Sequence, residues 1–141
     1  MSALHHVALR CRDFDRSVAF YQDVMGLRPL LGFKIDQGTR RVLLMAGEDS
    51  VRVELFESPS HPETEQDPLF MHLCFRSDDC RSDLERVRAA GYEVTEEART
   101  VTLENWCSDQ ADAAPSNCEV TFGFFKGPDG ELLEFFENSD T

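Results

Sequence analysis

The sequence contains two similar halves, and this internal repeat limits the possible folds more than any other feature of the chain. His6 and His72 are each followed by an arginine four positions later and by an aspartate seven positions later. Glu54 and Glu134 lie in the matching segments VELFES and LEFFEN, which end the two halves. The second half is longer by about 14 residues. Each half is therefore expected to be one copy of the same folding unit.

Each half is predicted to form a strand, a helix and then three strands, from the alternation and spacing of its apolar residues. In the first half these are Leu4–Cys11, Phe14–Met25, Leu27–Ile35, Arg41–Ala46 and Val51–Glu57. In the second half they are Phe70–Arg76, Cys80–Ala90, Glu93–Ala98, Val120–Phe125 and Glu131–Glu137. Asp13 is a candidate N-cap, Gly26 suits the left-handed residue after the first helix, and Gly127–Gly130 predicts a hairpin turn.

We expect one α+β domain made of two βαβββ modules. The first module covers residues 1–57 and the second covers 69–141. Residues 58–68, which are acidic and rich in proline, are predicted to be the linker. The additional residues of the second module form an insertion at about 103–119.

The period of a strand places the two histidines and two glutamates on one side of the predicted sheet. Apolar neighbours such as Leu9, Leu73 and Leu55 then face the helices. A set of two imidazoles and two carboxylates suits Ni²⁺, Zn²⁺, Co²⁺, Fe²⁺ or Mn²⁺, and it leaves two positions of an octahedral shell open. We predict one divalent metal ion, Ni²⁺ or Zn²⁺ before the others. The proposed ligands are His6, Glu54, His72 and Glu134.

Other candidate ligands are less well placed. His5 is predicted to face the helix, because it is adjacent to His6 in the same strand. His61 lies in the linker and has no counterpart in the repeat. Glu57 and Glu137 have the wrong parity, and they are predicted to be solvated residues at the rim.

Charge and cysteine content exclude several classes of protein. The formal net charge of −13 argues against nucleic acid and membranes as partners, although it also simply favours solubility. The N-terminus lacks the pattern of a signal peptide, so a cytoplasmic location is expected. Five cysteines without a C-x-x-C pair indicate neither a disulfide framework nor a zinc knuckle. A bridge between Cys107 and Cys118 is conceivable, but a reducing cytosol argues against it.

The sequence resembles the vicinal oxygen chelate superfamily, which includes glyoxalase I, bleomycin-resistance proteins and dioxygenases. The matching stretches are His6–Arg10 through Ser17–Tyr21, Val53–Glu57, His72–Arg76 and Gly127–Glu134. The resemblance implies a curved mixed sheet around an octahedral metal ion, and commonly a homodimer. A homodimer is also favoured because an eight-stranded sheet leaves edges that need covering.

The complete ligand set favours a lyase or isomerase that acts alpha to a carbonyl through an enediolate, as glyoxalase I does. By analogy, Glu134 is the proton-transferring base, and Glu54 is the second catalytic carboxylate. Arg10 matches a position that helps to hold the glutathione carboxylate in bacterial glyoxalase I. Arg10 and its repeat counterpart Arg76 are therefore candidate substrate-binding residues, or they neutralise an acidic pocket. Trp106, in the insertion, is a candidate substrate contact.

Two departures from glyoxalase I argue against the glutathione adduct as substrate. Ser58 replaces the asparagine that tends to follow the first metal glutamate by four positions, and the insertion has no equivalent in short bacterial enzymes. We interpret the insertion as a loop that covers the pocket, or else as a disordered surface segment. The alternative functions are a non-catalytic small-molecule binding protein of the bleomycin-resistance type and a metal-dependent dioxygenase of the same fold.

Overall fold

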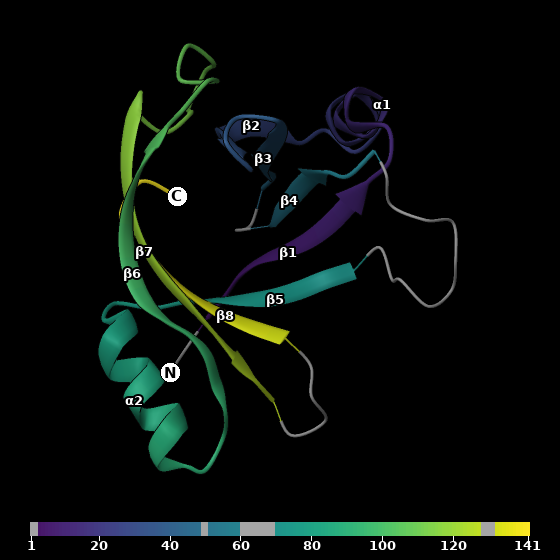
Figure 1. The fold of residues 1–141 in the computed structure, drawn as a ribbon. Coiled ribbons are helices and arrows are strands. Elements are labelled where there is room, and N and C mark those ends of the chain that lie inside the picture. Colours follow the sequence, from purple (N-terminus) through teal and green to yellow (C-terminus); the bar gives the residue numbers. More distant parts are fainter. Residues whose placement is uncertain (1–2, 49–50, 60–69, 128–131) are drawn as a thin grey trace.

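The structure, a computed structural model, describes residues 3–48, 51–59, 70–127 and 132–141. These residues form one eight-stranded mixed sheet, curved as Figure 1 shows, in the order β2-β3-β4-β1-β5-β8-β7-β6. The strands are β1 Leu4–Cys11, β2 Arg28–Ile35, β3 Arg40–Ala46, β4 Arg52–Glu57, β5 Phe70–Arg76, β6 Val94–Glu104, β7 Asn117–Lys126 and β8 Leu132–Glu137. The predicted α+β fold with two βαβββ modules is confirmed. The predicted linker, apart from its first two residues, and the predicted turn, apart from Gly127, lie outside the described residues.

The two modules join within one chain through their first strands. β1 pairs antiparallel with β5, and each also pairs in parallel with the last strand of its own module, β4 or β8. Ala8 is thereby opposite Glu54 on one side and His72 on the other, and Cys74 is opposite Glu134. The four central strands of the sheet therefore carry all four predicted metal ligands.

The helices cover the convex side of the sheet. α1 (Phe14–Ala19) packs with Leu9, Cys11 and Leu55, and α2 (Cys80–Ala89) packs with apolar residues of the second module such as Phe75 and Phe135. The side chains of Asp13 and Asp79 accept a hydrogen bond from the backbone three residues later and so begin each helix. The predicted helix 14–25 does not remain α-helical, because a π-helical segment, η1, continues it over Phe20–Val24. No helix among the described residues is long and apolar enough to span a membrane.

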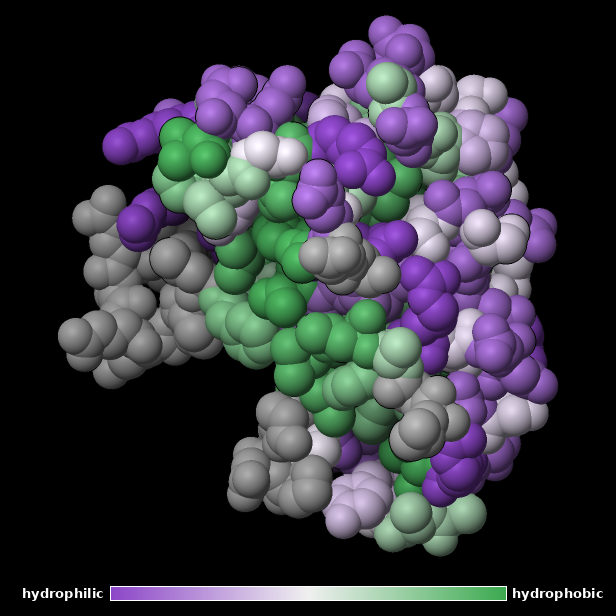
Figure 2. Space-filling model, turned by 180° about the vertical axis from the view of Figure 1, so that it is seen from behind, coloured by the Kyte–Doolittle hydropathy of each residue, from purple (hydrophilic) through white to green (hydrophobic). Residues whose placement is uncertain are grey.

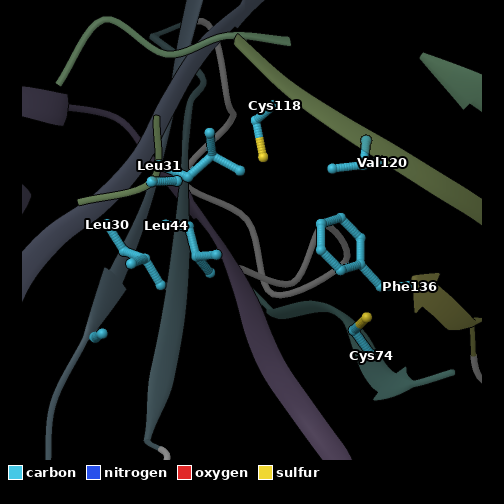
Figure 3. Close-up of a cluster of buried hydrophobic side chains, with 9 residues drawn as sticks. Leu30, Leu31, Leu44, Cys74, Cys118, Val120 and Phe136 are labelled. Atoms are coloured by element: carbon cyan, nitrogen blue, oxygen red, sulfur yellow. The ribbon is translucent and has the colours of Figure 1, made fainter. Parts of the chain in front are cut away.

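One end of the concave side is filled by core residues from both modules. Figure 3 shows Leu30, Leu31 and Leu44 of the first module facing side chains of the second. Their partners are Cys74, Cys118, Val120 and Phe136. This packing joins the two modules across the concave side of the sheet.

The insertion forms the ends of two paired strands and the loop that connects them. The strand predicted at 93–98 continues to Glu104, and the strand predicted at 120–125 already begins at Asn117. These added residues lack apolar alternation, but the two strands pair with each other and so stabilise them. The loop between them, residues 105–116, binds the edge of β2: Trp106 N donates to Gly32 O at 2.9 Å and Ala114 N donates to Leu30 O at 2.8 Å. We call residues 105–116 the strap. It is ordered, so the alternative of a disordered insertion is wrong.

The outer surface also carries exposed apolar residues. Val24 and Met25 are 69% and 57% exposed. Figure 2 shows apolar residues in a band across the middle of one face of the molecule. Apolar patches of this kind mark interaction surfaces. This feature is compatible with the predicted homodimer.

All five cysteines are free and buried, so the Cys107–Cys118 bridge does not form. Burial raises the pKa of these thiols, that of Cys80 to about 12. We therefore expect an aromatic disulfide reagent to label almost no thiol in the native protein at pH 8 and five thiols in guanidinium chloride. Rapid labelling of the native protein would contradict the burial of the cysteines.

Candidate metal centre

Four buried side chains meet at the middle of the sheet, one from each central strand. They are His6 of β1, Glu54 of β4, His72 of β5 and Glu134 of β8, which are 1%, 5%, 3% and 5% exposed. Their neighbours in sequence, such as Leu55, face the helices as the strand period predicts. Sequence reasoning therefore placed all four side chains on the correct side of the sheet.

The imidazole nitrogens of this cluster face the carboxylate oxygens. His72 Nε2 lies 2.7 Å from Glu134 Oε2, and His6 Nε2 lies 3.4 Å from the same oxygen. Glu54 Oε1 approaches His6 Nε2 at 3.3 Å. Ligand atoms of His6, His72 and Glu134 all lie within 4.8 Å of one another. The donors thus converge on one small volume.

This donor set fits a divalent cation. Among the described residues, neither His6 Nε2 nor His72 Nε2 has an aligned hydrogen-bond partner, and both atoms are fully buried. Both nitrogens lie close to carboxylate oxygens but are not well aligned with them for a hydrogen bond. A cation held between these nitrogens and the carboxylates of Glu54 and Glu134 would satisfy them, and nitrogen with oxygen donors suits a transition metal.

The electrostatics of the cluster favour charge at its centre. Burial opposes ionisation of Glu134, but His6 and His72 more than offset it and lower its pKa to about 2. Burial likewise opposes a charge on His6, but the adjacent Glu54 and the other neighbours reverse this and raise its pKa well above the usual value. The carboxylates therefore hold positive charge in this pocket, as a proton on His6 or as a bound cation.

A cavity of about 350 Å³ opens above the cluster. Glu54, His72 and Glu134 form part of its wall, and most of the remainder is apolar. The aromatic lining residues are Phe33, Phe56, Phe122, Phe124 and Phe136. Lys34, Glu96 and Arg99 are its other charged residues. Such a cavity suits a small molecule that carries an apolar group beside its metal-binding oxygens.

None of the three predicted substrate-binding residues lines this cavity. Arg10 lines a separate cavity of about 370 Å³ at the end of β1. Arg76 Nη2 donates to Thr141 O at 2.8 Å. Trp106 packs over Gly32 and lines a neighbouring cavity of about 540 Å³, which shares Phe33, Lys34 and Leu103 with the metal cavity.

Beyond Glu54, His72 and Glu134, sequence reasoning missed the residues that line the cavity. Phe122 and Phe124 repeat every second position after Val120, and this period indicates a single face of a strand. Lys34 gave no comparable signal. Arg99 was missed because the strand that became β6 was predicted to end at Ala98.

The positions predicted for His5, Glu57 and Glu137 are corrected. His5 is buried beside His6, because a β-bulge interrupts the parity of β1. Glu57 and Glu137 are not simply solvated at the rim. Glu57 Oε2 pairs with Arg41 Nη2 at 2.8 Å, and Glu137 Oε2 accepts a hydrogen bond from Cys80 N at 2.9 Å.

Comparison with known proteins identifies the family. Residues 3–135 match the model of the Glyoxalase/Bleomycin resistance protein/Dioxygenase superfamily. The chain belongs to this superfamily. It is 30% identical over 139 residues to the lactoylglutathione lyase of Haemophilus influenzae, covering 96% of this chain and 93% of the relative. It is 27% identical over 137 residues to a probable lactoylglutathione lyase of Vibrio parahaemolyticus, covering 94% and 88%.

A solved structure has the same fold. The methylmalonyl-CoA epimerase of Mycobacterium tuberculosis superimposes with a TM-score of 0.62 at 19% identity, covering 96% of this chain and 87% of the other. At this level of identity, the likeness concerns the arrangement of the two modules and not the substrate.

Proposed function

We propose that this protein is a divalent-metal-dependent lyase or isomerase that moves a proton alpha to a carbonyl group. His6, Glu54, His72 and Glu134 would hold the ion, with Ni²⁺ or Zn²⁺ preferred over Co²⁺, Mn²⁺ or Fe²⁺. One observation carries the proposal: two buried imidazole nitrogens without aligned hydrogen-bond partners face two carboxylates at the wall of a cavity. The relatives named lactoylglutathione lyase support the same reaction class.

The residues around the cavity have distinct tasks in this proposal. When bound, a divalent cation would polarise two vicinal oxygens of a substrate and acidify the C–H beside its carbonyl. Glu134 takes up that proton, and Glu54, which also lines the cavity, provides a second carboxylate for its return. The phenylalanines keep water from the reacting carbon and bind the apolar substituent of the substrate.

The cavity also bears on the substrate and on the competing functions. Since Arg10 and Arg76 lie elsewhere, the role predicted for Arg10 in holding a glutathione carboxylate gains no support from the geometry. A non-catalytic binding protein would use the same phenylalanine-rich walls without requiring the ion. A dioxygenase would need a further open coordination position, which four protein ligands do not leave.

The site lies within a single chain. All four proposed ligands come from strands that pair within one chain. A homodimer and a cytoplasmic location stay predictions, but a homodimer is not needed to bring the ligands together.

Metal content tests the proposal directly. Protein purified without chelator or nickel affinity resin is expected to contain close to one transition-metal ion per chain, and His72→Ala is expected to contain almost none, because one of four ligands is lost. Elemental analysis provides the measurement, and Phe70→Ala is the control because Phe70 is an exposed residue of the same strand.

Absence of metal from the wild type, with no uptake of added Ni²⁺, Co²⁺, Zn²⁺ or Mn²⁺, would refute the metal-dependent enzyme. The small-molecule binding protein would then be the better account of the cavity.

A further inference from the structure

We propose that His5 and Thr141 form a hydrogen-bonded chain that orients His6 toward the metal ion and fixes its tautomer. This inference rests on the metal centre proposed above and adds two positioning residues to it. Neither residue lines the metal cavity, and His5 is not one of the four ligands. Their contribution therefore depends on what they do to His6.

The backbone of β1 brings His5 and His6 together. Leu4 is opposite Phe75 and His6 is opposite Cys74, so β1 has one more residue than β5 at this point. A bulge of this type redirects a side chain that would otherwise alternate to the far face. As a result His5 Nδ1 lies 2.8 Å from His6 Nδ1, and both side chains are buried.

The short distance between the two nitrogens determines the positions of the protons. At 2.8 Å, two lone pairs would repel and two N–H groups would clash, so one nitrogen donates and the other accepts. His6 Nε2 faces Glu54 and Glu134 and must present a lone pair to a cation. His6 therefore carries its proton on Nδ1 and donates it to His5 Nδ1.

The same reasoning extends the chain to Thr141. If His5 Nδ1 accepts, the proton of neutral His5 is on Nε2, which lies 2.9 Å from Thr141 Oγ1. The hydroxyl oxygen accepts this bond. Thr141 is itself buried and held in place, because Arg76 Nη2 donates to its carbonyl oxygen at 2.8 Å. Arg76 thus has a structural partner in Thr141.

Packing keeps His5 in this position. The ring centroid of His5 lies 4.8 Å from that of Phe136 and 5.1 Å from that of His6. Cys74 Sγ is also near the two imidazoles, but a thiol is a weak hydrogen-bonding group. His5 is consequently the partner that controls the orientation of His6.

The test uses Co²⁺ as the probe, because its visible spectrum reports on coordination as well as binding. His5→Leu and Thr141→Val remove a hydrogen-bonding atom, and we expect each to weaken Co²⁺ binding by about 10- to 100-fold, the usual effect of losing a partner of a metal-binding histidine. His5→Asn keeps an acceptor near Nδ1, and Thr141→Ser keeps the hydroxyl. We expect Thr141→Ser to bind Co²⁺ within about threefold of the wild type. His5→Asn keeps the acceptor for His6 but loses the bond to Thr141, so its affinity is expected to lie between those of the wild type and His5→Leu.

The paired variants separate positioning from general stability. Thr141→Val is nearly isosteric but leaves the buried His5 Nε2–H without its acceptor, so it is expected to unfold at a lower temperature than Thr141→Ser, and Co²⁺ binding is compared well below both unfolding temperatures. Equal Co²⁺ affinity and spectra for the wild type, His5→Leu and Thr141→Val would overturn this inference while leaving the metal centre intact. No Co²⁺ binding by the wild type would overturn the metal centre itself.

Discussion

Glu134→Gln is expected to lower kcat by about 10²- to 10⁴-fold, the range that a positioned general base contributes. The amide can still offer an oxygen to a cation, but it cannot take up a proton from carbon. Glu134 is buried against both histidines and lines the cavity, so no solvent molecule readily replaces it. The assay measures the isomerisation of a 2-oxoaldehyde–thiol adduct by metal-loaded protein.

Two further variants serve as the control and as the test of the alternative base. Glu119→Gln removes an exposed carboxylate of β7 and is expected to leave kcat unchanged. Full activity in metal-loaded Glu134→Gln would remove Glu134 from the reaction. If Glu54→Gln lost activity while Glu134→Gln kept it, Glu54 of the first module would be the base.

The candidate metal centre was largely predictable because it depends on two regular properties of the chain. The repeat pairs Glu54 with Glu134, and the strand period places each acid on the face opposite to its apolar neighbours. Both properties are local or nearly so, and β4 and β8 are regular over the relevant residues.

The same argument failed where the backbone departs from regular geometry. His5 was assigned to the wrong side because a bulge adds one residue to β1, and no residue type near Leu4 signals it. The continuation of α1 as a π-helical segment over Phe20–Val24 was equally invisible, since the apolar spacing there suits an α-helix.

The strap lay beyond sequence reasoning for a different reason. Its position depends on contacts with β2, which is more than 70 residues away in the sequence: Asn105 Oδ1 accepts a hydrogen bond from Gly32 N at a separation of 73 residues. Its small and polar residues gave no periodic signal from which its path could be predicted. The strap ties the first module to the second at the open edges of the sheet, and it closes the end of the curved sheet above the core.

Asn105→Leu is therefore expected to destabilise the protein by about 3–5 kcal/mol, because several buried polar groups each lose a partner worth about 1–3 kcal/mol. Asn105 is 5% exposed. Its Oδ1 accepts from Gly32 N at 2.8 Å and from Cys107 N at 3.1 Å, and its Nδ2 donates to Ala114 O at 2.6 Å. Leucine fills a similar volume but bonds to none of these atoms. Urea unfolding followed by circular dichroism measures the loss.

The sole tryptophan shows whether this loss arises in the strap. Trp106 packs over Gly32 and is 44% exposed, so release of the strap is expected to shift its emission to longer wavelength before the sheet unfolds. Gln110→Ala is the matched control, since Gln110 is exposed in the same loop and is expected to change stability by less than about 0.5 kcal/mol. If Asn105→Leu matched this control in both stability and emission, the strap would not be what holds the two edges of the sheet together.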